Sequence, residues 1–195
     1  MGHTASKLPL VLSLDAAGNP CRWIDYEQSA YYYSKDLVAW AMGVVDYTLH
    51  GGTNAMSGRQ STLIINTIVA IKGKLSEKQL SRLNYVPLSN RMLFRRDQNL
   101  CAYCGHIFGA NDLTRDHIIP SAQGGCNTWM NIVTACEACN KHKDNRTPER
   151  ARMELLYVPY RPSRHEWLIL SNRNILADQM EFLMKGVPKE SRLYS

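Results

Sequence analysis

Two pairs of closely spaced cysteines constrain this chain more than any other feature. Each pair has the spacing CxxC, so that one tight turn can present two thiolates. Two such turns supply the four soft ligands of a closed, tetrahedral structural zinc site. The sequence therefore predicts a bound Zn²⁺ with no coordination position left open for catalysis. The four predicted ligands are Cys101, Cys104, Cys136 and Cys139.

The residues enclosed by these cysteines carry a different chemistry. Asp116 and His117 lie between the pairs, Gly124-Gly125 and Asn131 follow them, and Asn140 comes directly after the last cysteine. Carboxylate, imidazole and carboxamide groups are hard donors that suit Mg²⁺ or a similar cation. A zinc module alone does not need these residues. We therefore expect two metal sites, one that holds the fold and one that takes part in a reaction.

In this order and spacing, the motifs resemble the HNH endonucleases of the four-cysteine, zinc-stabilised type. The resemblance covers residues 89–153, in the form CxxC, LTxDHxxPxxxGG, a Trp and an Asn, CxxCNxxK and TPE. It implies an α+β fold in which a ββα-metal (His-Me finger) nuclease module is braced by the four-cysteine zinc site. Asn140 stands where the family name records a histidine.

The resemblance also implies a reaction and roles for named residues. The reaction is metal-dependent hydrolysis of phosphodiester bonds in DNA, which leaves 5′-phosphate and 3′-hydroxyl ends. His117 would be the general base, because imidazole titrates near neutral pH in its unperturbed form. Asp116 and Asn140 would hold the catalytic Mg²⁺ or Mn²⁺. Asn131 would fasten the loop to the catalytic strand, and Lys143 would contact phosphate.

Positive charge is concentrated just before the cysteine-rich segment. The chain has 195 residues and a formal net charge of +6, yet residues 1–60 contain more acidic than basic side chains. Residues 72–96 carry seven lysines and arginines against one glutamate. Such a block offers phosphate contacts to DNA or another nucleic acid. The expected nucleic-acid-binding residues are Arg91, Arg95, Arg96, Arg115, Lys141 and Lys143.

The sequence divides into three parts. Residues 1–88 are predicted to form a small α+β region, residues 89–153 the HNH module, and residues 154–195 a C-terminal helical extension. The apolar spacing favours a helix over 26–40 and a single amphipathic helix over 165–184. That last helix could pack on the N-terminal region or form a homodimer, and the sequence does not choose between them.

Within the module, Ser89 is a suitable N-cap for a short helix that ends at Arg96. Residues 107–108 are expected to pair with residues 113–119 as a hairpin. In a regular strand Asp116 and His117 would face opposite sides. We therefore expect a distorted or curved strand end that brings both side chains to one site.

Two classes of function remain open at this stage. The chain is either an HNH endonuclease or a catalytically silent, zinc-stabilised protein that binds nucleic acid or regulates another process. The set of Asp116, His117 and Asn140 favours the enzyme, because binding alone would not require it. The sequence contains no run long enough to span a membrane and no convincing signal peptide, so we expect a cytoplasmic protein.

Overall fold

The structure, a computed structural model, describes residues 9–73 and 76–194. The chain forms two compact units. The first unit comprises the residues up to Asn84 together with Asn172–Gly186. The second comprises Tyr85–Ser171 and Val187–Ser195. Residues 154–195, predicted as one C-terminal extension, are thus divided between the two units. The division of the chain into three domains stays a prediction.

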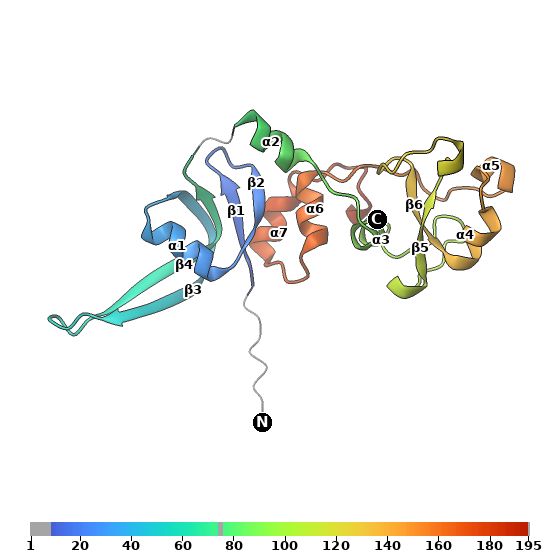
Figure 1. The fold of residues 1–195 in the computed structure, drawn as a ribbon. Coiled ribbons are helices and arrows are strands. Elements are labelled where there is room, and N and C mark those ends of the chain that lie inside the picture. The colour runs from blue at the N-terminus through green and yellow to red at the C-terminus, as the bar shows by residue number, and fades with distance from the viewer. Residues whose placement is uncertain (1–8, 74–75, 195) are drawn as a thin grey trace, which may run out of the picture. The chain divides into compact units, whose positions relative to one another are not determined.

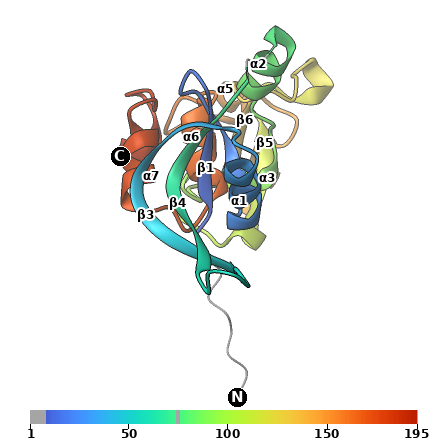
Figure 2. The same cartoon turned by 90° about the vertical axis from the view of Figure 1, so that its left-hand side faces the viewer.

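A four-stranded sheet forms the first unit, with the strand order β2-β1-β4-β3 (Figure 1). Strands β1 and β4 are parallel, and the other neighbours are antiparallel. Figure 2 shows that β3 is strongly curved. The strands are β1 (Val11–Asp15), β2 (Pro20–Ile24), β3 (Val38–Thr53) and β4 (Gln60–Ile71).

In its described residues, the first unit contains three α-helices. They are α1 (Tyr26–Ser34), α2 (Glu77–Asn84) and α7 (Ala177–Met184). Apolar side chains from β1, β2, α1 and β4 form one buried cluster, which contains Val11, Ile24, Tyr26, Ile65 and Val69. Helix α7 is bound to the sheet by the Gln179 amide, which donates to the carbonyls of Leu10 and Thr67 at 2.8 Å each.

The second unit is built around a two-stranded antiparallel sheet of β5 (Leu113–His117) and β6 (Ile132–Cys136). Its helices are α3 (Asn90–Arg96), α4 (Glu137–Lys143), α5 (Pro148–Ala151) and α6 (Arg164–Ser171). Side chains from α3, β5, β6 and α6 share one core, which includes Leu93, Leu113, Trp129, Ile132 and Leu170. The second unit is therefore the α+β module, in which strand, strand and helix follow one another as β5, β6 and α4.

Helix α3 forms where the sequence predicts it. The side chain of Ser89 accepts a hydrogen bond from the backbone N–H of Met92 at 3.3 Å, so it is the N-cap. The helix ends at Arg96, and Gln98 and Asn99 beyond it have positive φ angles. This helix leads directly into the first cysteine pair.

Two predicted helices have different limits in the structure. The helix expected over 26–40 ends at Ser34, because Asp36 adopts a φ of 53° that a helix cannot continue through. The helix expected over 165–184 is two helices, α6 and α7, which belong to different units. Between them the Asn172 side chain accepts a hydrogen bond from the backbone N–H of Asn174, a local turn that competes with helical bonding.

The predicted hairpin of residues 107–108 with 113–119 is wrong. Ile107 forms an isolated bridge with Leu100, and β5 pairs along its length with β6. Residues 107–108 and strand β6 are both apolar, and residues 107–108 are closer to β5 in the sequence. The sequence pattern therefore favoured residues 107–108 as the partner. The second cysteine pair, however, has to return beside the first, and β6 carries it there.

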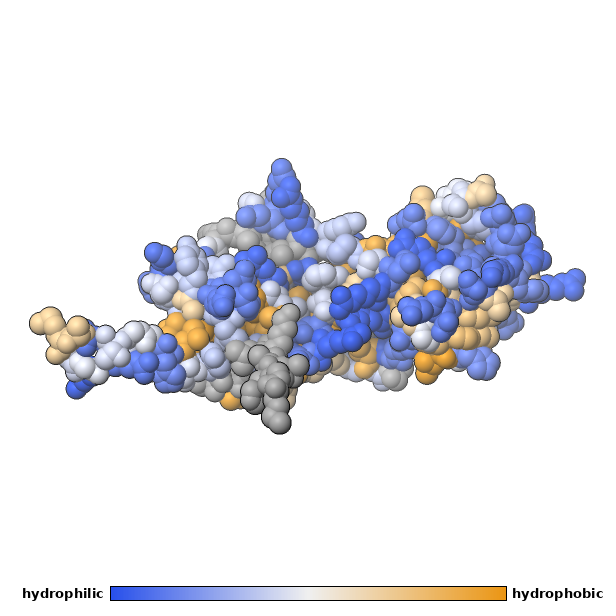
Figure 3. Space-filling view, turned by 60° about the horizontal axis from the view of Figure 1, so that its bottom comes forward, coloured by the Kyte–Doolittle hydropathy of each residue, from blue (hydrophilic) through white to orange (hydrophobic). Residues whose placement is uncertain are grey.

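The described residues contain no helix long and apolar enough to cross a membrane. The face seen in Figure 3 is largely hydrophilic, with hydrophobic residues in small, separate patches.

Candidate functional site

The four predicted zinc ligands lie together. The Sγ atoms of Cys101, Cys104, Cys136 and Cys139 are all within 4.8 Å of one another. The first pair is closed by a turn in which the Gly105 N–H donates to the Cys101 carbonyl at 3.1 Å, with Gly105 at a φ of 71°. The second pair spans the end of β6 and the first turn of α4. Four sulfurs at this separation fit one tetrahedrally bound Zn²⁺.

The thiols of the cluster differ in acidity. Burial raises the pKa of Cys101, but hydrogen bonds from the backbone N–H groups of Cys104, Cys136 and Tyr103 outweigh it and bring the pKa to about 7. Burial, followed by the interaction with the Cys136 thiol, raises the pKa of Cys139. Neighbouring thiolates repel one another. A divalent cation that binds all four sulfurs would offset this repulsion and favour the thiolate form of each cysteine.

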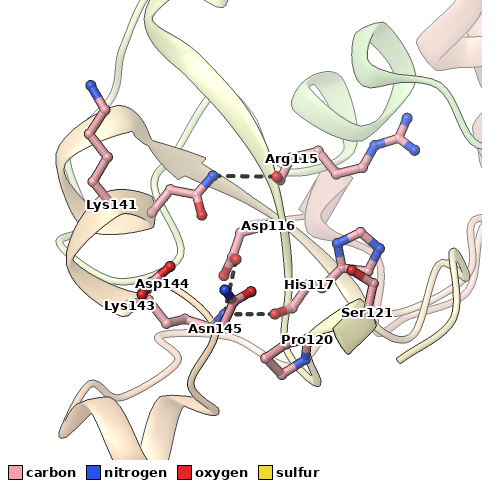
Figure 4. A pocket seen from close by; sticks show the side chains of 10 residues that line it. Arg115, Asp116, His117, Pro120, Ser121, Lys141, Lys143, Asp144 and Asn145 are labelled. Atoms are coloured by element: carbon pink, nitrogen blue, oxygen red, sulfur yellow. Dashed lines mark hydrogen bonds and ion pairs between the residues drawn. The ribbon is translucent and has the colours of Figure 1, made fainter. Parts of the chain in front are cut away.

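Strand β5 brings the Asp-His pair to the end of the small sheet. In the β5–β6 register Asp116 lies opposite Val133 and His117 opposite Ile132, with no register shift. In Figure 4 the imidazole of His117 lies on the opposite side of the strand from the carboxylate of Asp116. The expected distortion of the strand end is therefore absent. Both residues still line one pocket, because this pocket lies across the end of the strand.

That pocket has a volume of about 340 Å³ and collects most of the predicted chemical groups. It receives Asp116 and His117 from β5, Asn140 and Lys143 from α4, and Ser121 from the turn after β5. The residues that line it are Arg115, Asp116, His117, Pro120, Ser121, Asn140, Lys141, Lys143, Asp144 and Asn145.

Asp116 is held by two donors, and its residue is only 5% exposed. The Lys143 ammonium donates to Oδ1 at 3.0 Å, and the Tyr103 hydroxyl donates to Oδ2. Burial, followed by the bond to Asp116, raises the pKa of Tyr103 far above its usual range. The phenol therefore stays protonated and remains a donor at any working pH.

Lys143, which is predicted to contact phosphate, has a buried side chain. Its residue is 1% exposed, and its ammonium also donates to the His117 carbonyl at 2.7 Å. Two of the three ammonium N–H groups are thus used within the protein, and one is left for a group in the pocket that Lys143 lines. In this geometry Lys143 ties α4 to the end of β5 and neutralises Asp116.

His117 has a partner that the sequence analysis did not identify. Its Nε2 atom lies 3.0 Å from Oδ1 of Asn127. Because an amide oxygen only accepts hydrogen bonds, this contact selects the tautomer with the proton on Nε2. The Nδ1 atom then keeps a free lone pair and can accept a proton.

Asn140 presents its carboxamide from the first turns of α4. Its Nδ2 atom donates to the Thr114 hydroxyl at 2.8 Å and to the Arg115 carbonyl at 3.5 Å. These bonds fix the amide so that Oδ1 is the group left for a cation. Asn140 and Asp116 together thus offer two hard oxygen donors in one pocket, which suits a cation that keeps several waters.

Asn131 fastens the loop between β5 and β6. Its Nδ2 atom donates to the carbonyls of Ile119 and Cys126 at 3.1 Å each, and its Oδ1 accepts from the Ile119 N–H at 2.9 Å. Gly125 crosses the same place so closely that an added Cβ would lie 1.7 Å from the Ile119 carbonyl oxygen. The loop that carries Asn127 is therefore fixed against the strand end.

Arg96 is a correction to the predicted nucleic-acid contacts. Its side chain is fully buried, pairs with Asp97 at 2.7 Å and donates to the carbonyls of Trp129, Tyr160 and Ile132. It therefore joins α3 to the loop, to β6 and to the segment after α5. Because no part of the side chain reaches the surface, it cannot contact DNA in this fold.

The other predicted basic residues are at least partly accessible. Arg91 and Lys141 are exposed, and Lys141 pairs with Glu137 at 3.1 Å. Arg115 is half-buried, lines the pocket and donates to Asn90 at 2.9 Å. Arg95 is also half-buried, and its guanidinium donates to the Leu170 carbonyl. Arg91, Arg115 and Lys141 thus remain the better placed of the predicted phosphate contacts.

Comparison with known proteins places the site in a recognised sequence context. Residues 101–156 match the family model described as HNH endonuclease. The CRISPR-associated endonuclease Cas9 of Corynebacterium diphtheriae is 28% identical over 109 residues, which cover 52% of this chain and 10% of the relative. The protein of the same name from Actinomyces naeslundii is 44% identical over 61 residues, which cover 31% of this chain and 5% of the relative.

The chain thus spans a tenth or less of the length of these two relatives. The crystal structure of the Type II-C Cas9 enzyme from Actinomyces naeslundii aligns with a TM-score of 0.31 and 22% identity, over 56% of this chain and 13% of that chain. This overlap is too weak to support an argument about the site.

Proposed function

We propose that residues 101–156, an HNH endonuclease domain related to the HNH regions of Cas9 endonucleases, hydrolyse phosphodiester bonds in DNA. The observation that supports this most directly is the pocket that Asp116, His117 and Asn140 line together. Strand β5 supplies Asp116 and His117, and helix α4 supplies Asn140. The pocket therefore contains a candidate base, His117, and two candidate oxygen ligands.

His117 is the general base in this proposal. The Nε2–H bond to Asn127 holds the ring, so that Nδ1 can take a proton from an attacking water. The resulting imidazolium would be stabilised by the Asn127 carbonyl oxygen on its other side. Water activated in this way needs a phosphate held in line, which is the task of the accessible basic residues around the pocket.

Asp116 and Asn140 would hold a divalent ion, Mg²⁺ or Mn²⁺, in the same pocket. Such an ion supplies positive charge to the scissile phosphate and to the departing 3′ oxygen, and so favours products with 5′-phosphate and 3′-hydroxyl ends. Lys143 and Tyr103 each donate a hydrogen bond to the Asp116 carboxylate and so hold it in place. Each carboxylate oxygen has two lone pairs and accepts one of these bonds, so each keeps a lone pair for the ion.

Zinc in the four-cysteine cluster has a structural task in this proposal. The four clustered cysteines would hold the ion with all of their sulfurs, and a zinc ion bound in this way would serve the fold and not the reaction. One domain carries one such pocket, and cleavage of both DNA strands would then take two events or a second copy of the chain.

Plasmid cleavage tests the proposal. We expect the zinc-loaded protein to nick or linearise supercoiled plasmid with Mg²⁺ or Mn²⁺ and to leave it intact in excess EDTA. Asp116→Asn should raise the Mn²⁺ concentration needed for cleavage, whereas Glu181→Gln, an exposed change in the other unit, should not. A folded, zinc-loaded protein that binds DNA but cuts it with neither metal would reject the enzyme in favour of a silent binding protein.

A further inference from the structure

Tyr103 connects the two predicted metal sites. It lies inside the first cysteine pair, between Cys101 and Cys104, and its hydroxyl donates to Oδ2 of Asp116 on β5. The residue is half-buried, and its ring packs against the cluster of Cys101, Ala135 and Cys136. A single side chain thus touches both the structural cluster and the carboxylate of the pocket.

The backbone around Tyr103 is held on both sides. The Ala102 N–H donates to the Thr134 carbonyl on β6 at 2.8 Å, and the Ala102 carbonyl accepts from the Leu156 N–H at 2.9 Å. The Gly105 N–H closes the turn onto the Cys101 carbonyl. Ligation of Cys101 and Cys104 to one metal would add the last constraint, so the position of the phenol depends on the cluster.

The carboxylate of Asp116 depends in turn on the phenol. Lys143 holds Oδ1 and Tyr103 holds Oδ2, so the plane of the carboxylate cannot rotate while both bonds exist. Without the Tyr103 hydroxyl, the Oδ2 atom of the buried Asp116 carboxylate would lose this hydrogen-bond donor. Hydrogen bonds of this kind orient metal-binding carboxylates, and their loss costs about 10- to 100-fold in metal affinity or activity.

We propose that Tyr103 is a positioning residue that couples the cysteine cluster to the divalent-ion pocket by fixing the Asp116 carboxylate. The proposal rests on the proposed function only in taking Asp116 as a ligand of the divalent ion. Tyr103 is not among the residues that line the pocket, so it would act through Asp116. The cluster then does more than hold the fold, because it sets the geometry of one ligand of the second metal.

The test is direct Mn²⁺ binding, measured by electron paramagnetic resonance on zinc-loaded protein without DNA. Tyr103→Phe removes only the hydroxyl, and we expect the dissociation constant for Mn²⁺ to rise about tenfold with the zinc content unchanged. Tyr160→Phe is the matched control, because its hydroxyl is also in the second unit but donates to Glu166 at 2.5 Å. Its Mn²⁺ affinity should equal that of the wild type.

Cleavage supplies a second, separable measurement. High Mn²⁺ should restore cleavage by Tyr103→Phe, as expected for a weakened ion site. Equal Mn²⁺ affinities in Tyr103→Phe and wild type would overturn the coupling, and so would an equal loss in Tyr160→Phe. A Tyr103→Phe protein that loses its zinc would also overturn it, because the hydroxyl would then be needed for the fold itself.

The outcomes separate this inference from the proposed function. A wild type that binds Mn²⁺ more tightly than Tyr103→Phe but never cuts DNA would uphold the coupling and reject the nuclease. A wild type that cuts DNA with no difference in Mn²⁺ affinity would reject the coupling alone. A wild type that binds no Mn²⁺ would reject both.

Discussion

Asn127 holds the His117 ring in the tautomer that a general base needs. A free imidazole exchanges between two tautomers, and only one of them presents a given nitrogen to water. The 3.0 Å contact between His117 Nε2 and Asn127 Oδ1 selects one form and fixes the ring. The partner lies in a loop that is itself fixed by Asn131 and Gly125.

We expect Asn127→Ala to lower kcat for plasmid cleavage about tenfold and to leave KM nearly unchanged, because the ring would be less often in the reactive orientation. Asn127→Asp should keep most of the rate, since a carboxylate oxygen also accepts the Nε2–H bond. The measurement is single-turnover cleavage across DNA concentrations. Equal rates for Asn127→Ala and wild type would show that the contact does not orient the base.

The sequence predicted the four-cysteine cluster, which the structure contains, whereas the ligands of the divalent ion stay a prediction and several contacts were missed. The cysteine spacing requires one cluster, and the Asp-His pair before a proline requires a strand end, so these residues could be named in advance. Tyr103 and Asn127 carry no spacing signal, because their contacts depend on how a turn and a loop fold over β5. The family resemblance predicts a phosphate contact for Lys143 and the basic block predicts one for Arg96, yet both residues are 1% exposed.

A buried cation joins helix α3 to the rest of its unit, in addition to the apolar core that they share. The guanidinium of Arg96 pairs with Asp97, which in turn accepts a hydrogen bond from the Thr134 N–H at 3.0 Å. The guanidinium also lies over the rings of Trp129 and Tyr160, at 5.3 and 5.6 Å from their centroids. The arginine thus joins α3 to the loop at Trp129, to β6 and to the segment at Tyr160.

Arg96→Met should destabilise the second unit by about 3–5 kcal/mol, because it leaves the buried Asp97 carboxylate without its charged partner. Chemical denaturation checks this value. Arg91→Met, an exposed change on the same helix, should shift stability by no more than about 0.5 kcal/mol. Similar small effects of both changes would contradict the assigned role of Arg96.

Element boundaries were harder to predict than element types. The cap at Ser89 is a local signal, and α3 formed as expected. Apolar spacing over 165–184 is continuous across the break between α6 and α7, so periodicity alone could not reveal the turn at Asn172. The pairing of β5 with β6 depends on contacts between residues far apart in the sequence, and the nearer apolar segment was a misleading partner.

For the molecule as a whole, the two compact units predict a difference in their dependence on metal. The cysteine cluster lies in the second unit, while the first unit has its own sheet and apolar core. Structural zinc contributes its binding free energy to folding. Loss of zinc should therefore weaken one unit and spare the other.

Hydrogen exchange of the full chain checks this expectation. We predict that a zinc chelator strongly increases exchange in β5, β6 and α4 and changes β1 and β4 little. Readdition of Zn²⁺ should restore the protection. An equal loss of protection in both units, or none in either, would show that the cluster does not hold the second unit selectively.

Plasmid cleavage shows whether this HNH domain cuts DNA with His117 as its base. Supercoiled plasmid is incubated with zinc-loaded wild type, with His117→Ala, and with His142→Ala, which removes an exposed histidine of α4. We predict Mg²⁺- or Mn²⁺-dependent nicking by wild type and His142→Ala, and a loss of at least about 100-fold in His117→Ala. Metal-dependent cleavage by His117→Ala at the wild-type rate would contradict the account.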